Sequence, residues 1–293
     1  MNTRQQLTKF EKSLDVIRSI TRAFERTATQ KMSVNRQEIE KIAKHLDEVK
    51  QTYVNTKISI TKGAEQRQKM LATSVRRVSK QKVVILVTSE PQYYGNLMPA
   101  MIREFSKELE SGASDAIIIG KPGREEFDKV NRRGFGYVYY DFSDDAPDWQ
   151  IVGKISKVIK EYAQINIIFC RFQSILAQDV LNQNIAREVL NVKVPEKKKY
   201  LIKPEPASVL TFLEKQIITS NLLQKLFENG LAKGAIRIRI LEIGEIAEKL
   251  TETMEKFEIY KKKVVRNINN RKQTSLYGAS SAWQSESIFT IYR

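Results

Sequence analysis

The 293-residue chain has little cysteine and histidine, and each shortage excludes a kind of chemistry. Its one cysteine, Cys170, cannot form an internal disulfide, which fits a reducing intracellular compartment. Its one histidine, His45, has no second metal-ligand candidate on its predicted helix, so we expect a solvated side chain there. No histidine is placed to activate Ser89, and His and Cys residues do not cluster. We therefore expect no catalytic residue and no metal site.

Long apolar runs and phosphate-binding glycine motifs are absent as well. The apolar segments are shorter than the roughly 18 residues that a membrane helix needs, and the first residues are charged where a signal peptide is apolar. These features predict a soluble, intracellular protein. Neither Gly-x-Gly-x-x-Gly nor Gly-Lys-Ser/Thr occurs, so we expect no directly bound nucleotide or other cofactor.

Proline is absent from residues 207–277, which allows one helix of about 100 Å at about 1.5 Å per residue. Residues 3–60 supply a long partner, because most of their apolar side chains from Leu7 to Tyr53 recur at spacings of three or four. Three or more heptads favour a coiled coil over a helix lying on a globular core. Residues 235–243 alternate like a strand, but helical spacing on both sides favours a helix. The stretch also holds glycines that would permit bending or a close helix approach: Gly230, Gly234 and Gly244.

Between these two helices the apolar pattern changes its period. Continuous apolar runs predict buried strands, and amphipathic segments between them predict helices. We predict four strands, at residues 82–88, 115–119, 136–142 and 165–172. We predict helices at residues 96–110, 125–133 and 150–163, with an acidic turn at 143–148. This alternation indicates a small doubly wound, Rossmann-like domain.

These patterns predict an α/β protein: a long antiparallel coiled coil of the amino- and carboxy-terminal helices plus the small doubly wound domain. Three prolines around a run of lysines mark a linker before the last helix. We divide the chain into an amino-terminal coiled-coil helix with its connection (1–81), an α/β domain (82–194), a linker (195–206), a carboxy-terminal coiled-coil helix (207–279) and a tail (280–293).

The formal net charge of +16 is confined to the two predicted helices. Residues 1–82 carry 19 basic and 8 acidic side chains, residues 207–277 carry 13 and 8, and the remainder is balanced. Such a surface could attract nucleic acid, anionic lipid or acidic protein surfaces, or could simply be a solvated helix surface. Charge alone leaves these alternatives open.

Several short motifs, in the same order along the chain, resemble those of the gamma subunit of F-type ATP synthases. Residues 17–24 (IRSITRAF) and 28–32 (ATQKM) are similar to that family's KIT-x-AM and AASKM signatures. Residues 119–124 (IGKPGR) resemble its IG-x-x-GR loop. Further matches are Thr88-Ser89-Glu90 with Gly95-Asn96-Leu97, Arg171-Phe172, Glu205-Pro206, Ala235 with Arg237, and Gly278-Ala279.

The resemblance implies a central rotor shaft without a catalytic site of its own. It implies a hexameric ring of alternating alpha and beta ATPase subunits around the shaft, with ATP, ADP and magnesium held by those subunits. An epsilon subunit and a membrane rotor ring would be partners at the foot of the shaft, and the complex would lie on the cytoplasmic face of the membrane. We chose candidate contacts to the catalytic ring by their charge: Arg22, Lys31, Lys57, Arg237, Arg239 and Arg271.

The carboxy-terminal tip departs from the family pattern. The family's terminal arginine–glutamine pair would fall near Val264-Val265, and its two nearby glutamates at Arg271 and Thr274. Residues 280–293 extend beyond the family's usual end, as a disordered tail or a docking segment. These departures would also suit a paralogous shaft in an ATP-hydrolysing motor that transmits force. A basic coiled-coil protein that binds nucleic acid is the alternative from another class, although aromatic residues do not interleave with the basic runs.

Overall fold

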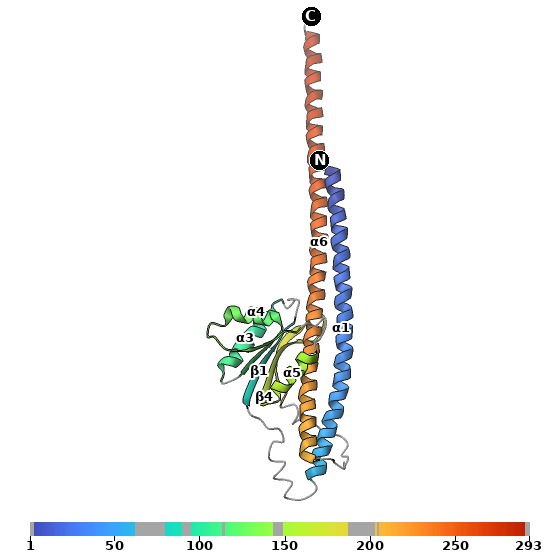
Figure 1. Cartoon of the computed structure of the whole chain (residues 1–293). Helices are drawn as coiled ribbons and strands as arrows, with labels where there is room; N and C mark the ends of the chain where they lie inside the picture. Colours follow the sequence, from blue (N-terminus) through green and yellow to red (C-terminus); the bar gives the residue numbers. More distant parts are fainter. Residues whose placement is uncertain are drawn as a thin grey trace. The chain divides into compact units, whose positions relative to one another are not determined.

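The computed structural model describes residues 3–61, 80–89, 95–112, 115–142, 149–186, 203 and 205–290. Two long helices dominate these residues, α1 (Thr3–Thr61) and α6 (Pro206–Thr290) (Figure 1). The chain forms two compact units. One comprises Arg22–Ile240, and the other comprises Met1–Thr21 with Leu241–Arg293, so that each long helix contributes to both.

Within the larger unit, α1 and α6 pack against each other as the apolar spacing predicts. Ala28 and Met32 of α1 are buried against Leu231, Ala235 and Ile238 of α6. Further along α1, the Tyr53 hydroxyl donates a 2.8 Å hydrogen bond to Glu214 Oε1 on α6. Burial raises the pKa of this phenol, and the Glu214 carboxylate raises it further. The predicted pairing of the two helices is confirmed.

Residues 235–243, whose alternation resembles a strand, belong to α6. Their helical conformation lets Ala235, Ile236 and Ile238 be buried together, because these positions fall on adjacent parts of one helical surface. The prediction of a helix here is therefore confirmed.

Five strands form one mixed sheet in the order β3-β2-β1-β4-β5. Four of them were predicted and are mutually parallel. Their bounds are β1 (Lys80–Val87), β2 (Asp115–Ile119), β3 (Val138–Tyr140) and β4 (Tyr162–Phe172). The fifth strand, β5 (Gln178–Asn184), pairs antiparallel with β4 at the sheet edge and was not predicted. Its sequence, QDVLNQN, is mostly polar and lacks the apolar run by which the other strands are recognised.

Helices cover both faces of this sheet. Alternate β1 residues, Val84 and Leu86, belong to a core shared with α3 (Leu97–Glu110) and α4 (Lys121–Val130). The intervening residues Val83, Ile85 and Val87 belong to a second core shared with α5 (Trp149–Ile159), α1 and α6. The α/β domain is thus doubly wound, and the two long helices form part of its second helical layer (Figure 1).

Some predicted boundaries are wrong for identifiable reasons. Helix α4 begins at Lys121 rather than at residue 125, because Pro122 is compatible with the first turn of a helix. Strand β3 covers only residues 138–140 of the predicted 136–142. The predicted acidic turn at 143–148 lies outside the described residues, as does the linker apart from Lys203, Glu205 and Pro206. Helix α6 continues to Thr290, so residues 280–290 of the tail extend the helix.

In the smaller unit, Arg18 of α1 joins two carboxylates of α6. Its Nη2 lies 2.6 Å from Glu252 Oε2, and its Nε lies 3.7 Å from Glu248 Oε1. Among the side chains that the structure describes in this unit, the predicted apolar seam is not closed. Exposed apolar side chains follow one face of α6 here at spacings of three and four, and we name them the apolar stripe: Ile243, Ile246, Leu250, Met254 and Phe257.

Candidate functional site: the shaft helix and the carboxyl edge of the sheet

The loop after β2 contains the glycines of the IG-x-x-GR resemblance, and it encloses Thr88 rather than an open space. Gly120 has φ +91°, and a Cβ built there would lie 2.2 Å from the Thr88 carbonyl oxygen. A Cβ at Gly123 would lie 2.7 Å from Thr88 Oγ1. Both glycines therefore let the end of β1 approach the first turn of α4.

Thr88 also occupies the hydrogen-bonding position where a phosphate would be expected. The Gly123 N–H donates to Thr88 Oγ1 at 3.0 Å, and this hydroxyl donates to the Ile119 carbonyl oxygen at 2.8 Å. A free N–H at the first turn of a helix is what anion sites use, and here the chain's own hydroxyl engages it. The loop resembles a phosphate-binding turn in its glycines, but its geometry is that of a structural turn.

Helix α6 supplies polar side chains at the carboxyl ends of β1 and β4. Lys233 Nζ donates to Ser89 Oγ at 3.0 Å, and Asn229 Oδ1 accepts the Cys170 N–H at 3.2 Å. These α6 residues were missed from the sequence. Their spacing of four within an otherwise apolar helix face was the available signal, since a helix buried by apolar packing alone would carry apolar residues there.

The titratable groups with clearly shifted pKa values are dispersed, and the carboxylates among them are held in structural pairs. Burial raises the pKa of Glu108, but hydrogen bonds from Lys82 at 2.5 Å and from two asparagines lower it more, so the net pKa falls. The Tyr162 hydroxyl, 2.6 Å away, and Lys80 together lower the pKa of Asp115. Burial raises the pKa of the Cys170 thiol to about 12, so this cysteine is a poor nucleophile. Among the described residues, no group of three or more His, Cys, Asp or Glu could hold a metal ion.

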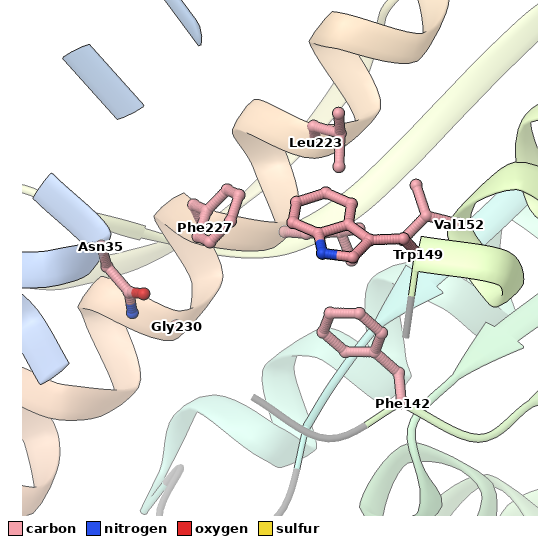
Figure 2. A pocket seen from close by; sticks show the side chains of 8 residues that line it. Asn35, Phe142, Trp149, Val152, Leu223, Phe227 and Gly230 are labelled. Atoms are coloured by element: carbon pink, nitrogen blue, oxygen red, sulfur yellow. The ribbon is translucent and has the colours of Figure 1, made fainter. Parts of the chain in front are cut away.

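A small apolar cavity lies beside Trp149 in the larger unit. In Figure 2 the side chains of Phe142, Leu223 and Phe227 surround the Trp149 ring. The volume open to a ligand is about 20 Å³, which is the space of about one water molecule. A nucleotide could not enter a cavity of this size.

The six candidate contact residues differ in exposure. Arg22, Lys57 and Arg271 are exposed. Lys31, Arg237 and Arg239 are half-buried. The Arg237 guanidinium lies 5.1 Å from the centre of the Phe24 ring, and Arg239 Nη1 donates to the Leu176 carbonyl oxygen at 3.0 Å. Five of the six belong to the larger unit and Arg271 to the smaller one. Their contact with a catalytic ring stays a prediction.

The tip of α6 presents the residues at which the sequence departs from the family pattern. Val265 is 48% exposed, and Arg271 and Thr274 are exposed as well. The Thr274 hydroxyl is satisfied by the Asn270 carbonyl oxygen one turn earlier, at 2.8 Å. No helix among the described residues has an apolar stretch long enough to cross a membrane.

Comparison with known proteins supplies the family. A sequence model of the ATP synthase family, ATP-synt, matches residues 4–256. Among solved structures, the chain is similar to one in the central stalk and c-ring of Tetrahymena thermophila mitochondrial ATP synthase. The TM-score is 0.51 and the identity 15%, over 77% of this chain and 99% of that chain. A chain of the Euglena gracilis mitochondrial ATP synthase rotor is also similar, with a TM-score of 0.45 and 15% identity over 87% of this chain and 99% of that one. No curated protein sequence matches.

The Tetrahymena likeness supports the fold, and the family match covers most of the chain. The shaft geometry agrees with both, since α1 and α6 pair along their length within the larger unit while the sheet offers no open nucleotide site among the described residues. Nothing in the comparisons favours the force-transmitting paralogue or the nucleic-acid-binding alternative. The chain belongs to the gamma-subunit family of F-type ATP synthases, whose members are the central rotor shafts of these rotary motors.

Proposed function

We propose that this shaft turns inside a hexameric ring of alternating alpha and beta ATPase subunits and couples their ATP synthesis or hydrolysis to rotation. The observation that carries the proposal is the apolar stripe on α6, whose five side chains are between 57% and 70% exposed. A stripe of this size on one helix face is typical of a protein interaction surface. A ring that encloses the shaft would bury it.

An asymmetric shaft can couple sites without chemistry of its own. Rotation presents different faces of α6 to each ring subunit in turn, and each contact favours an open or a closed state of that subunit. By linkage, nucleotide binding at one subunit then biases the orientation of the shaft by the same free energy. ATP, ADP and magnesium would be bound by the ring, and the shaft would bind no cofactor and have no catalytic site. Two observations support nucleotide binding by the ring rather than by the shaft. Thr88 occupies the glycine turn after β2, and the cavity beside Trp149 measures only about 20 Å³.

The cationic candidates have a role in this arrangement that does not require permanent binding. Arg22, Lys57 and Arg271 are exposed and can attract acidic ring surfaces as the shaft turns. Lys31, Arg237 and Arg239 are partly exposed and would contribute to the same attraction. At the foot of the shaft we propose an epsilon subunit and a membrane rotor ring, with the complex peripheral to the cytoplasmic face of the membrane. The similar Tetrahymena chain comes from a central stalk solved together with a c-ring, and this supports a membrane rotor ring as a partner.

Purification of the complex from native cells tests this function. We expect one copy of the chain to co-purify with three copies of each of two ATPase subunits, and imaging to show the apolar stripe inside the ring. ATP should then rotate a probe attached to the shaft. A chain that remains free of any ATPase ring under all purification conditions would contradict the proposal.

A further inference from the structure

Three buried polar side chains lie on one face of α6, at a spacing of four residues. Lys225, Asn229 and Lys233 are 7%, 1% and 8% exposed. Residues four apart in a helix lie one above the other, so the three form a row on consecutive turns. We name this row the polar ladder. Burying polar groups costs free energy unless they are bonded, so their partners show what the row does.

The middle member bonds to β4 at the point where β1 no longer reaches it. The parallel register of β1 with β4 ends at the pair Leu86–Ile168, whereas β4 continues to Phe172. Cys170 lies in this overhang, and its backbone N–H donates to Asn229 Oδ1 at 3.2 Å. The asparagine amide therefore takes the place of β1 along the part of β4 that β1 does not reach.

The next member bonds to the end of β1 itself. Lys233 Nζ lies 3.0 Å from Ser89 Oγ, and the serine is 1% exposed. In the strand order β3-β2-β1-β4-β5, the chain reverses its direction of growth between β1 and β4. Doubly wound sheets bind their ligands in the crevice at the carboxyl ends of such a pair. Two consecutive turns of α6 therefore fill the position that a ligand would take.

The first member is held by electrostatic attraction. Lys225 Nζ lies 5.2 Å from the centre of the Phe169 ring and 3.2 Å from each carboxylate oxygen of Glu228. The carboxylate balances the ammonium charge, so this residue can remain buried beside β4. Close approach of the helix is possible because Ala232, between the polar members, is small and fully buried among residues of the sheet and α3.

We propose that the polar ladder fixes the orientation of α6 about its own axis relative to the α/β domain. Its side chains occupy the position at the sheet where a ligand would otherwise bind. Apolar packing is non-directional, whereas these hydrogen bonds fail if the helix turns by one residue, which is about 100°. A buried polar group that fixes register in this way is known from coiled coils. The α/β domain consequently turns with the shaft instead of slipping around it. This last step rests on the proposed rotor function.

Amide hydrogen exchange in the isolated full-length chain tests the ladder directly. We expect Asn229→Leu to raise the exchange rate of the Cys170 amide about fivefold, since one buried hydrogen bond is lost. Asn229→Asp keeps an acceptor oxygen and should retain most of the protection. Lys215→Met replaces an exposed lysine of the same helix and is the matched control for Lys233→Met. Only Lys233→Met, which frees the end of β1 at Ser89, should raise exchange of the adjacent Thr88 amide, which is bonded to the Ile119 carbonyl oxygen.

An unchanged exchange rate of the Cys170 amide in Asn229→Leu would contradict the proposed role of the polar ladder. If Asn229→Leu does not fold, Asn229→Asp decides instead. Protection equal to that of the wild type supports the assigned acceptor, and loss of protection in a folded Asn229→Asp chain contradicts it. These results do not depend on the ring or on rotation.

The mechanical consequence is tested in the assembled complex. A probe attached to Lys107→Cys on α3 reports on the α/β domain, and buried Cys170 will not compete for the label. We expect wider angular fluctuations of this probe during pauses in Asn229→Leu/Lys233→Met than in wild type or Lys215→Met. Equal fluctuations would overturn the mechanical role. Failure of the wild-type shaft to rotate would instead contradict the proposed function, while the exchange results would still decide the ladder.

Discussion

At the scale of single residues, Gly120 shows why the glycine loop after β2 needs its sequence. Glycine readily adopts its φ of +91°, whereas residues with a Cβ rarely do. A Cβ at this position would also lie 2.2 Å from the Thr88 carbonyl oxygen. The neighbouring backbone cannot move away cheaply, because the Thr88 N–H is bonded to the Ile119 carbonyl oxygen at 2.8 Å. The IG-x-x-GR motif is thus explained by packing around Thr88.

We predict that Gly120→Ala destabilises the chain by about 3 kcal/mol, because the substitution adds both backbone strain and a steric clash. Chemical denaturation of the isolated chain measures this change in the free energy of unfolding. Gly136→Ala is the matched control, since a Cβ there meets nothing within 4 Å and the change should stay within about 0.5 kcal/mol. Equal stability of the two variants would show that the Thr88 turn does not limit stability.

At the scale of elements, α1 and α6 approach each other closely at Gly234. A Cβ at this position would lie 2.5 Å from Met32 Cγ, and Met32 is itself buried. The sequence allowed either bending or a close helix approach here. The structure identifies the close approach.

Two glycines of the same helix give opposite predictions. Gly244→Ala should stabilise the chain by about 0.5–1 kcal/mol, because alanine favours helix and a Cβ there meets nothing within 4 Å. Gly234→Ala gains the same helix propensity but displaces Met32, so we expect a net loss of about 1–2 kcal/mol. Thermal unfolding of both variants measures the difference. Addition of Met32→Ala should relieve the clash in Gly234→Ala, and a stabilising Gly234→Ala alone would contradict the close approach.

The elements that could be predicted from the sequence are those whose burial leaves a regular pattern. The α1–α6 pair and strand β2 (Asp115–Ile119) follow from apolar spacing, because one face or both faces of each are buried. Strand β5 could not be found this way. It lies at the sheet edge, so its polar residues remain partly solvated and no apolar run is needed. The polar ladder could not be predicted for a related reason. Its members are buried but polar, and only the structure shows their partners at the end of β1 and on β4.

At the scale of the whole molecule, the apolar side chains of α6 serve a different purpose in each of the two units. Leu231, Ala235 and Ile238 of α6 are buried against α1 in the larger unit. Leu250 and Phe257 continue the same apolar spacing in the smaller unit, yet they are 60% and 67% exposed. Intramolecular packing therefore explains the first part of the pattern and leaves the apolar stripe for a partner.

We predict that Leu250→Ser/Met254→Ser/Phe257→Ser leaves the unfolding temperature of the isolated chain nearly unchanged, because these side chains are already exposed. The same substitutions should weaken binding to the ATPase ring at least about tenfold, since each apolar side chain buried by the ring contributes roughly 1.5–3 kcal/mol. Titration of purified ring with labelled shaft measures the affinity. Glu258→Ser/Lys262→Ser provides the control, because it removes an exposed ion pair of the same helix without changing its net charge or its apolar surface. If the triple variant binds the ring as tightly as this control, then the stripe is not the surface that the ring encloses, and the exposed cations Arg22, Lys57 and Arg271 would have to carry the contact.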